Sequence, residues 1–255
     1  MEINEFDDFI DETGDVSEDF AADQQKGEKV SPSGIINGLD YLYQKSLDGF
    51  LPKNKPIEEI AQDYLNKKDG DVSRAAKAML NTQIAKCTTS GFVTGLGGLF
   101  TMPLTLPANA ISVLYIQIRM IQCTAYMGGF DLNDDEVQTF IFACLAGLSV
   151  TNILKSAGVK ICESLARSAI EKIPDKVLIK INQKVGIKLI SKFSEKGLIK
   201  LGRIVPLAGA GLNATIDLVE TKIIANRAYK MFIEKDFSVC DKKSKKTGEI
   251  DVVFN

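Results

Sequence analysis

Histidine and tryptophan are both absent from this chain of 255 residues. Without histidine the chain has no Ser-His-Asp or Cys-His relay, no imidazole general base and no imidazole metal ligand. It also has no Walker A sequence, the glycine-rich loop whose lysine binds phosphates. These absences exclude the commonest hydrolase and nucleotide-binding arrangements, and the sequence predicts neither a metal site nor a cofactor.

Cysteine is sparse and scattered along the chain. The five cysteines are far apart, their number is odd, and none forms a C-x-x-C pair. This spacing favours reduced, mostly buried thiols in a cytosolic protein over a disulfide framework. We expect neither Cys87 nor Cys123 to act as a nucleophile, because no neighbouring residue would supply a base.

Charge is divided unevenly between the start of the chain and the rest. Residues 1–29 hold eleven acids against two lysines, about −9, so the remainder carries about +7 of the overall net charge of −2. The acidic start lacks the basic segment of a secretory signal. We expect residues 1–30 to be a disordered acidic arm. It is either a solubilising tail or an intramolecular mimic of an anionic surface that docks on the basic half.

The body of the chain shows helical periodicity. Apolar residues recur three and four positions apart, as at Ile36, Leu39, Tyr43 and Leu47. No alternating run bounded by hairpin turns indicates strands. The prediction is an all-α fold over residues 31–236, a multi-helix bundle with glycine- and proline-interrupted apolar helices, followed by a flexible tail over residues 237–255.

Punctuating residues predict several helix boundaries. Pro56 suits a first helical turn, and Asp71 suits a cap. A helix over residues 107–127 is expected to end at the Gly128-Gly129 pair. A second core helix is expected to run from an Asn133 cap to residue 154.

Between residues 87 and 118 no side chain is charged, a run of about thirty residues. It is long enough for a bilayer span, but two prolines break it, so we favour helices packed closely in a core over full spanning. Glycine-rich stretches allow close approach of helices. The residues predicted to serve helix packing are Gly91, Gly95, Gly98, Pro103, Pro107, Pro206, Gly209 and Gly211.

One of these stretches formally matches a dinucleotide-binding fingerprint, Gly209-x-Gly211-x-x-Ala214. Pro206 precedes it in place of a clear strand, and no strand–helix–strand alternation surrounds it. We therefore interpret it as helix packing.

Lysine recurs at every fourth position over residues 172–200. Each step of four turns a helix by about 400°, so a single straight helix would carry lysine almost all round. We therefore predict at least one interruption, at Pro174, Gly186 or Gly197. With Arg119, which closes the long apolar run, the residues predicted to bind lipid or an acidic partner are Lys176, Lys180, Lys184, Lys188, Lys192, Lys196 and Lys200.

Aliphatic residues lie between these lysines, a pattern typical of an interfacial helix on anionic lipid. The alternative is a solvated face of a soluble bundle, whose lysine stems cover the edges of the core. Nucleic acid is disfavoured as a partner, because arginine is scarce and no aromatics are interleaved for base stacking.

Two stretches carry a resemblance to a known family. Residues 97–109 (GGLFTMPLTLPAN), 117–119 (QIR) and 125–131 (AYMGGFD) resemble the signature region of EcsC-family proteins. Residues 205–210 (VPLAGA), continuing to Phe232, resemble the C-terminal segment of that family. The resemblance covers roughly residues 35–235 and implies a bacterial, helical protein linked to membrane processes. It supplies no catalytic residues.

The expected function is a non-enzymatic helical protein at the inner face of the cytoplasmic membrane. It would bind an anionic membrane surface or a membrane protein complex. The sequence also allows a homo-oligomer. One alternative is a histidine-independent hydrolase of lipid or peptide, with Asp217, Glu220 and Glu136 as first suspects. Another alternative is a soluble protein-binding scaffold.

Overall fold

The computed structural model describes residues 32–49, 55–86, 108–148, 151, 154–155, 173–193 and 212–237. Its elements are α2 (Pro32–Asp48), α3 (Ile57–Lys67), α4 (Val72–Lys86), α5 (Ala108–Met127), α6 (Asp135–Ala146), α9 (Asp175–Phe193), α11 (Leu212–Ala228) and the π-helix η2 (Tyr229–Ile233). The described part contains no strand. The predicted all-α, multi-helix fold is confirmed. The acidic arm at 1–30 and the tail beyond 237 lie outside the described residues.

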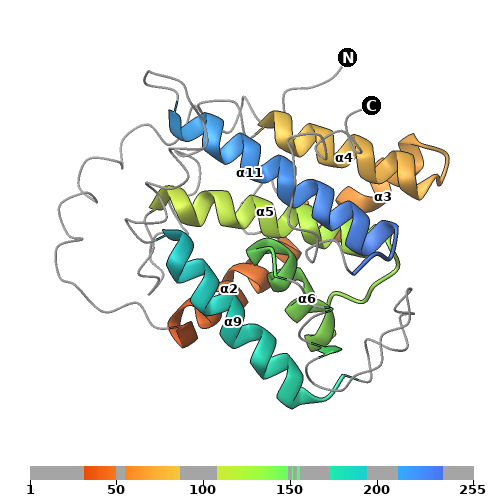
Figure 1. Ribbon diagram of the computed structural model, residues 1–255. Coiled ribbons are helices and arrows are strands. Elements are labelled where there is room, and N and C mark those ends of the chain that lie inside the picture. Colours follow the sequence, from red (N-terminus) through yellow and green to blue (C-terminus); the bar gives the residue numbers. More distant parts are fainter. Residues whose placement is uncertain are drawn as a thin grey trace.

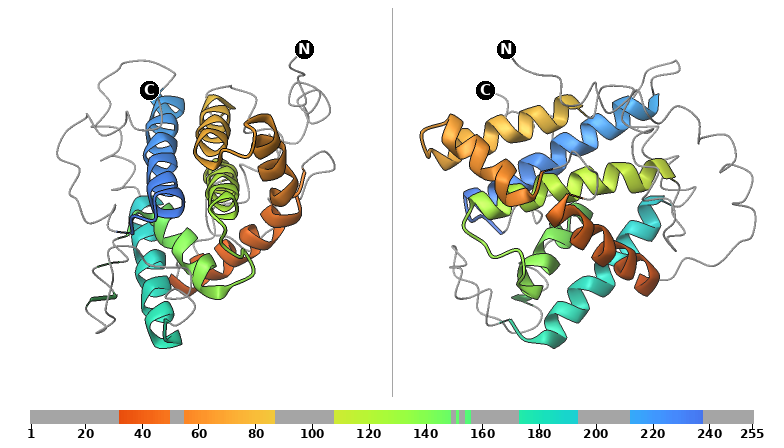
Figure 2. Two further views of the ribbon diagram at one scale, coloured as in Figure 1. Left: turned by 90° about the vertical axis from the view of Figure 1, so that its right-hand side faces the viewer. Right: turned by 180° about the vertical axis from the view of Figure 1, so that it is seen from behind.

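Helix α5 lies at the centre of the bundle. It packs against α2, α3, α4, α6, α11 and η2, and Figures 1 and 2 show these elements around it. Helix α9 does not belong to this set. It packs against α2 and α6 at the edge of the bundle (Figure 1), so one side of α9 is left for solvent.

Three helices end in the same hydrogen-bonded turn. At the end of α5, Gly129 has a φ of 83°, its N–H donates to Tyr126 O, and the N–H of Phe130 donates to Ala125 O. This is a Schellman motif, which requires a residue in the left-handed conformation. Gly147 ends α6 in the same way, with a φ of 62°. Helix α3 uses the same turn. The predicted stop at Gly128-Gly129 is therefore confirmed.

Helix α6 is shorter than predicted at both ends. It begins at Asp135 with Asp134 in the cap position, and Asn133 instead lies in a turn where its N–H donates to Asp131 Oδ1. The helix was expected to continue through the uncharged run to residue 154, but it ends at Ala146, and Gly147 follows in the left-handed conformation. Glycine reaches the left-handed conformation without steric cost, so it ends a helix even inside an apolar run.

Helix α9 corrects part of the interpretation of the lysine repeat. The helix begins directly after Pro174, one of the predicted interruptions, but it continues without a break through Gly186. Gly186 is buried. A helical glycine costs about 1 kcal/mol relative to alanine, and packing at this buried position offsets that cost. Gly197 lies outside the described residues.

Helices α5 and α11 run parallel and in register. Gln117 donates from Nε2 to Thr221 Oγ1 at 3.2 Å, a pair separated by 104 residues. Gly128 and Phe232 are separated by the same 104 residues, and they meet at the far end of the pair. A Cβ added to Gly128 would lie 2.3 Å from the Phe232 carbonyl oxygen. Only glycine permits this approach of η2 to the end of α5.

Aromatic residues close the same end of the bundle. The rings of Phe130 and Phe232 meet edge to face with centroids 5.3 Å apart, and Phe237 adds contacts to Phe130 and Phe140. Lys235 lies over the Phe130 ring, 4.0 Å from its centroid, and donates to a carbonyl of the α5 end. Phe237 is buried.

Among the described residues, every helix falls short of the length or the apolar character that crossing a bilayer would require. The predicted packing residues at positions 91, 95, 98, 103, 107, 206, 209 and 211 all lie outside the part that the structure describes.

Replacing Gly128 by alanine should destabilise the protein by about 2 kcal/mol, because the new methyl group overpacks against the Phe232 carbonyl. A glycine-to-alanine change in a helix ordinarily stabilises. The matched control is Gly34→Ala, at an exposed position of α2. Urea denaturation followed by circular dichroism measures both. A stabilised Gly128→Ala variant would show that the approach to η2 is not tight.

Candidate functional site

Arg119 links three segments of the chain. Its guanidinium donates from Nη1 to Ser46 O and from Nη2 to Lys55 O, both at 2.6 Å, and it lies 5.7 Å from the centre of the Tyr115 ring. Ser46 O belongs to the last turn of α2, where carbonyls lack partners within the helix. Arg119 therefore caps the end of α2 and holds it to the start of α3. This geometry assigns it an internal structural role.

Further hydrogen bonds hold α2 against α5. Ser46 Oγ donates to Gln122 Oε1 at 2.6 Å, and Gln122 Nε2 donates to Tyr43 O at 3.2 Å. The Tyr43 hydroxyl donates to Leu132 O at 2.7 Å, beyond the end of α5. All four residues are buried. Burial raises the pKa of the Tyr43 phenol above its ordinary range, so the hydroxyl stays a donor.

Helix α9 carries an exposed face, which we name the basic α9 face and define by Lys176, Lys180, Lys184, Ile179 and Ile187. The two isoleucines are 55% and 59% exposed, and the three lysines are exposed beside them. Among the described residues, no ion pair forms at these three lysines. The predicted separation of lysines from aliphatics is therefore incomplete, because Ile179 and Ile187 share the exposed side.

The opposite side of α9 is apolar and fully packed. Val177, Leu178, Ile181, Val185 and Leu189 are all buried in the core shared with α2 and α6. The helix is thus held by one face and free on the other. Ile179 and Ile187 stay more than half exposed, which leaves part of each side chain accessible to a partner.

Lys188 has a different environment from the other lysines. Its Nζ donates to the carbonyl oxygen of Gly147, at the C-terminal end of α6. The Arg227 guanidinium lies at the same place, where a Cβ added to Gly147 would be 2.4 Å from Nη1. Two cations at the negative end of a helix dipole stabilise it. Lys188 therefore belongs in part to the scaffold.

Three further lysines of the predicted binding set are described less fully. Lys192 lies on the backbone of α9, but its side chain falls outside the described set, as do Lys196 and Lys200 altogether.

A cavity of about 390 Å³ lies between α2, α6 and α9, beside Ile179. Three carboxylates line it, Asp40 of α2 and Asp135 and Asp175 at the starts of α6 and α9. Gln138 Nε2 donates to Asp40 Oδ1 at 2.7 Å. Burial raises the pKa of the Asp40 carboxyl, the Gln138 bond opposes that effect, and the charge of Asp135 adds to it.

Helix geometry separates this cavity from the lysines. Along α9, Lys180 lies about 100° from Ile179 in one direction, whereas the cavity residue Asn182 lies about 60° away in the other. On the surface of α9, Ile179 therefore lies between the side that carries the lysines and the side that faces the carboxylate-lined cavity. The lysines project toward solvent without facing the carboxylates.

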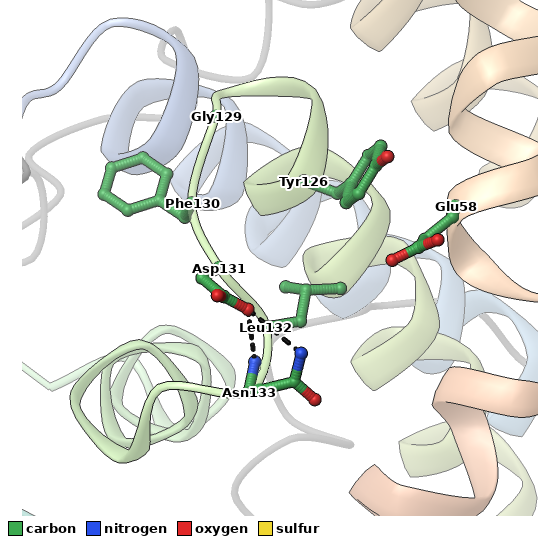
Figure 3. Close-up of a pocket in the computed structure, with 7 residues that line it drawn as sticks. All are labelled: Glu58, Tyr126, Gly129, Phe130, Asp131, Leu132 and Asn133. Carbon is green, nitrogen blue, oxygen red and sulfur yellow. Dashed lines mark hydrogen bonds between the residues drawn. The ribbon is translucent and has the colours of Figure 1, made fainter.

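A second cavity, of about 510 Å³, lies where α5 turns into α6 (Figure 3). Glu58 of α3 and Tyr126 of α5 face it, together with the segment 129–133. Asp131 is tied to Asn133, whose backbone N–H and side-chain amide both donate to Asp131 Oδ1. A carboxylate held in this way shapes the turn, and no residue lining this cavity is a cysteine, serine or threonine nucleophile.

Two of the residues suspected for catalysis lie on different helices, Glu136 on α6 and Glu220 on α11. Neither described cavity is lined by Glu136 or Glu220, and the side chain of Asp217 lies outside the described residues. Cys123 is a buried free thiol, and burial raises its pKa to about 12, so it is protonated at neutral pH. The cavity carboxylate Asp40 was missed, although its helical spacing from Ile36 and Tyr43 placed it on a partly packed face. No cluster of metal-ligating side chains occurs within the described ranges.

Arg119→Gln should lower the free energy of unfolding by about 2 kcal/mol, because two carbonyls lose charge-assisted donors. Binding of the folded variant to anionic vesicles should be unchanged. Arg74→Gln, which removes an exposed guanidinium paired with Asp71, is the control and should change stability much less. Equal losses of stability in both variants, or a selective loss of vesicle binding at Arg119, would contradict the structural role.

Asp40→Asn should stabilise the protein at neutral pH while keeping an acceptor for Gln138. Because folding raises the pKa of this carboxyl, its favourable contribution is present below its ordinary value of 3.8 and is lost as pH rises through the folded pKa. The gain in melting temperature should therefore be seen at pH 7 and fade near pH 4. The exposed control Glu234→Gln should show no such pH-dependent gain.

Comparison with known proteins identifies the family. The model of the EcsC protein family matches residues 18–233, which span all the described helices. Neither a curated protein nor a solved structure matches the chain significantly. The family match includes the α5–α6 junction and the α11–η2 segment, whose packing around Gly128 is described above. This chain belongs to the EcsC protein family.

Proposed function

We propose that this protein associates peripherally with the anionic, cytoplasmic face of a bacterial membrane through the basic α9 face. The single observation that carries the proposal is the placement of Ile179 and Ile187 on the same exposed side as Lys176, Lys180 and Lys184. Two large aliphatic side chains exposed among lysines match the composition of an interfacial helix. On a membrane, isoleucine enters the boundary with the acyl chains while lysine contacts anionic headgroups.

The expected free energy of membrane binding is small enough for the binding to be reversible. Each lysine near an anionic surface contributes about 1 kcal/mol. Burying the exposed part of each isoleucine contributes about 1 kcal/mol more. The total of about 5 kcal/mol corresponds to a dissociation constant of about 0.2 mM. This protein would then exchange between membrane and solution, and it would respond to salt because exposed charges are screened.

A non-enzymatic role agrees with the two cavities of the described part. In one cavity Asp40 accepts from Gln138, and in the other Asp131 accepts from Asn133. In the cavity beside Ile179 the hydroxyl of Thr139 accepts a hydrogen bond from Asn182 Nδ2 at 3.3 Å, whereas covalent catalysis needs a nucleophile that an adjacent base activates.

The proposal predicts a selective loss of vesicle binding when the lysines are neutralised. The test variant is Lys176→Gln, Lys180→Gln and Lys184→Gln together. Binding to phosphatidylglycerol-containing vesicles in a sedimentation assay should weaken by about a hundredfold, from three contributions of about 1 kcal/mol. The control changes the same charge elsewhere, at Lys67, Lys68 and Lys155, and should leave binding nearly unchanged.

A second pair of variants, one test and one control, addresses the exposed isoleucines. Ile187→Ser should weaken binding, whereas Ile223→Ser, which alters an isoleucine 37% exposed on α11, should not. Vesicles of phosphatidylcholine alone should bind neither protein. Equal binding by the lysine variant and its control, or binding that ignores both vesicle charge and salt, would overturn the proposal.

A further inference from the structure

The basic α9 face has a complementary segment within the same chain. Residues 1–29 carry eleven acids against two lysines. Within them the sequence 5–12, EFDDFIDE, places Phe6, Phe9 and Ile10 among five acidic residues. The α9 face has the reverse composition, with lysines beside Ile179 and Ile187. Charge and apolar character are thus matched on both sides.

The spacing of the apolar residues in this segment also fits a helical partner. Phe6, Phe9 and Ile10 are three and four positions apart, so a helix formed on binding would place all three on one side. Amphipathic segments bind apolar strips of a folded partner through such spacing. On α9 the two exposed isoleucines are eight positions apart, about two helical turns.

The connection brings this segment to the α9 face at high local concentration. The arm joins the body at the start of α2, and α2 packs directly against α9. About thirty residues reach up to about 100 Å when extended, whereas the 19 residues of α9 span about 28 Å. A tether of this kind gives effective concentrations in the millimolar range. Contacts too weak to hold a free peptide then suffice.

We propose that residues 5–12 bind the basic α9 face of the same molecule and compete with the anionic membrane for it. The regulatory part of this inference rests on the proposed function. The arm would mimic the anionic membrane surface and thereby inhibit membrane binding. Residues 1–17 precede the family match, which begins at residue 18. Residues 5–12 thus lie outside the part of the chain that the family model matches.

The first measurement is vesicle binding by the full chain with a neutralised arm. The variant carries Asp7→Asn, Asp8→Asn, Asp11→Asn and Glu12→Gln. It should bind anionic vesicles about tenfold more tightly than the parent, as expected if the arm covers the face about nine-tenths of the time. The control carries the same charge change on exposed acids of the body, Glu58→Gln, Glu59→Gln, Asp69→Asn and Glu234→Gln. It should show a much smaller gain.

The second measurement does not involve membranes. A carbodiimide, which joins a carboxylate directly to a lysine amine, should link the arm to Lys176, Lys180 or Lys184 in the full chain, as mapped by mass spectrometry. The links should diminish in Ile179→Ser with Ile187→Ser. In a mixture of isotopically light and heavy protein they should join residues of the same molecule.

The outcomes separate the two proposals. Arm-to-α9 links without any vesicle binding would support the docked arm and overturn the membrane function. Vesicle binding that the neutralised arm leaves unchanged, together with absent links, would overturn the docked arm and leave the membrane function standing. Links that join light to heavy protein would overturn intramolecular docking in favour of contact between two copies.

Discussion

The fold depends on the way α5 holds the end of α2. Arg119 donates to Ser46 O, which the geometry of a helix end leaves without an intrahelical partner, and Gln122 adds a donor to α2 at Tyr43 O. Buried carbonyls that lack donors are costly, so these contacts determine where α2 can lie. Because α9 packs on α2, the position of the exposed α9 face follows from the same hydrogen bonds.

The residues that carry the family resemblance serve packing in this structure. Gln117 bonds Thr221 across the α5–α11 pair, Arg119 caps α2, and Gly128 admits the Phe232 carbonyl. Each satisfies a backbone or side-chain requirement between helices distant in sequence. The family match, over residues 18–233, covers all of these contacts. The surface to which we assign function lies on α9, outside these contacts.

The lysines of α9 lie in two different electrostatic environments. Lys188 lies at the end of α6, where the carbonyl oxygen of Gly147 accepts a hydrogen bond from its Nζ, and it supports the scaffold. Lys176, Lys180 and Lys184 project into solvent, where their charges act on what approaches from outside. Ile179 lies between them and the carboxylate-lined cavity around Asp40.

The sequence by itself determined the helical class, the stop at Gly128-Gly129, the cap at Asp71 and the basic character of residues 172–193, because periodicity, left-handed glycine and charge are local properties. Asp71 does accept the N–H of Arg74, as its position predicted. Tertiary structure alone decided that Gly147 would end α6, that Gly186 would stay helical, and that Arg119 would face inward. It also decided that Ile179 and Ile187 would stay exposed while Ile181 and Leu189 became buried. The exposure of residues on α9 depends on the faces that α2 and α6 present to it, and the orientation of Arg119 depends on the packing of α5 against α2. No local pattern contains that information.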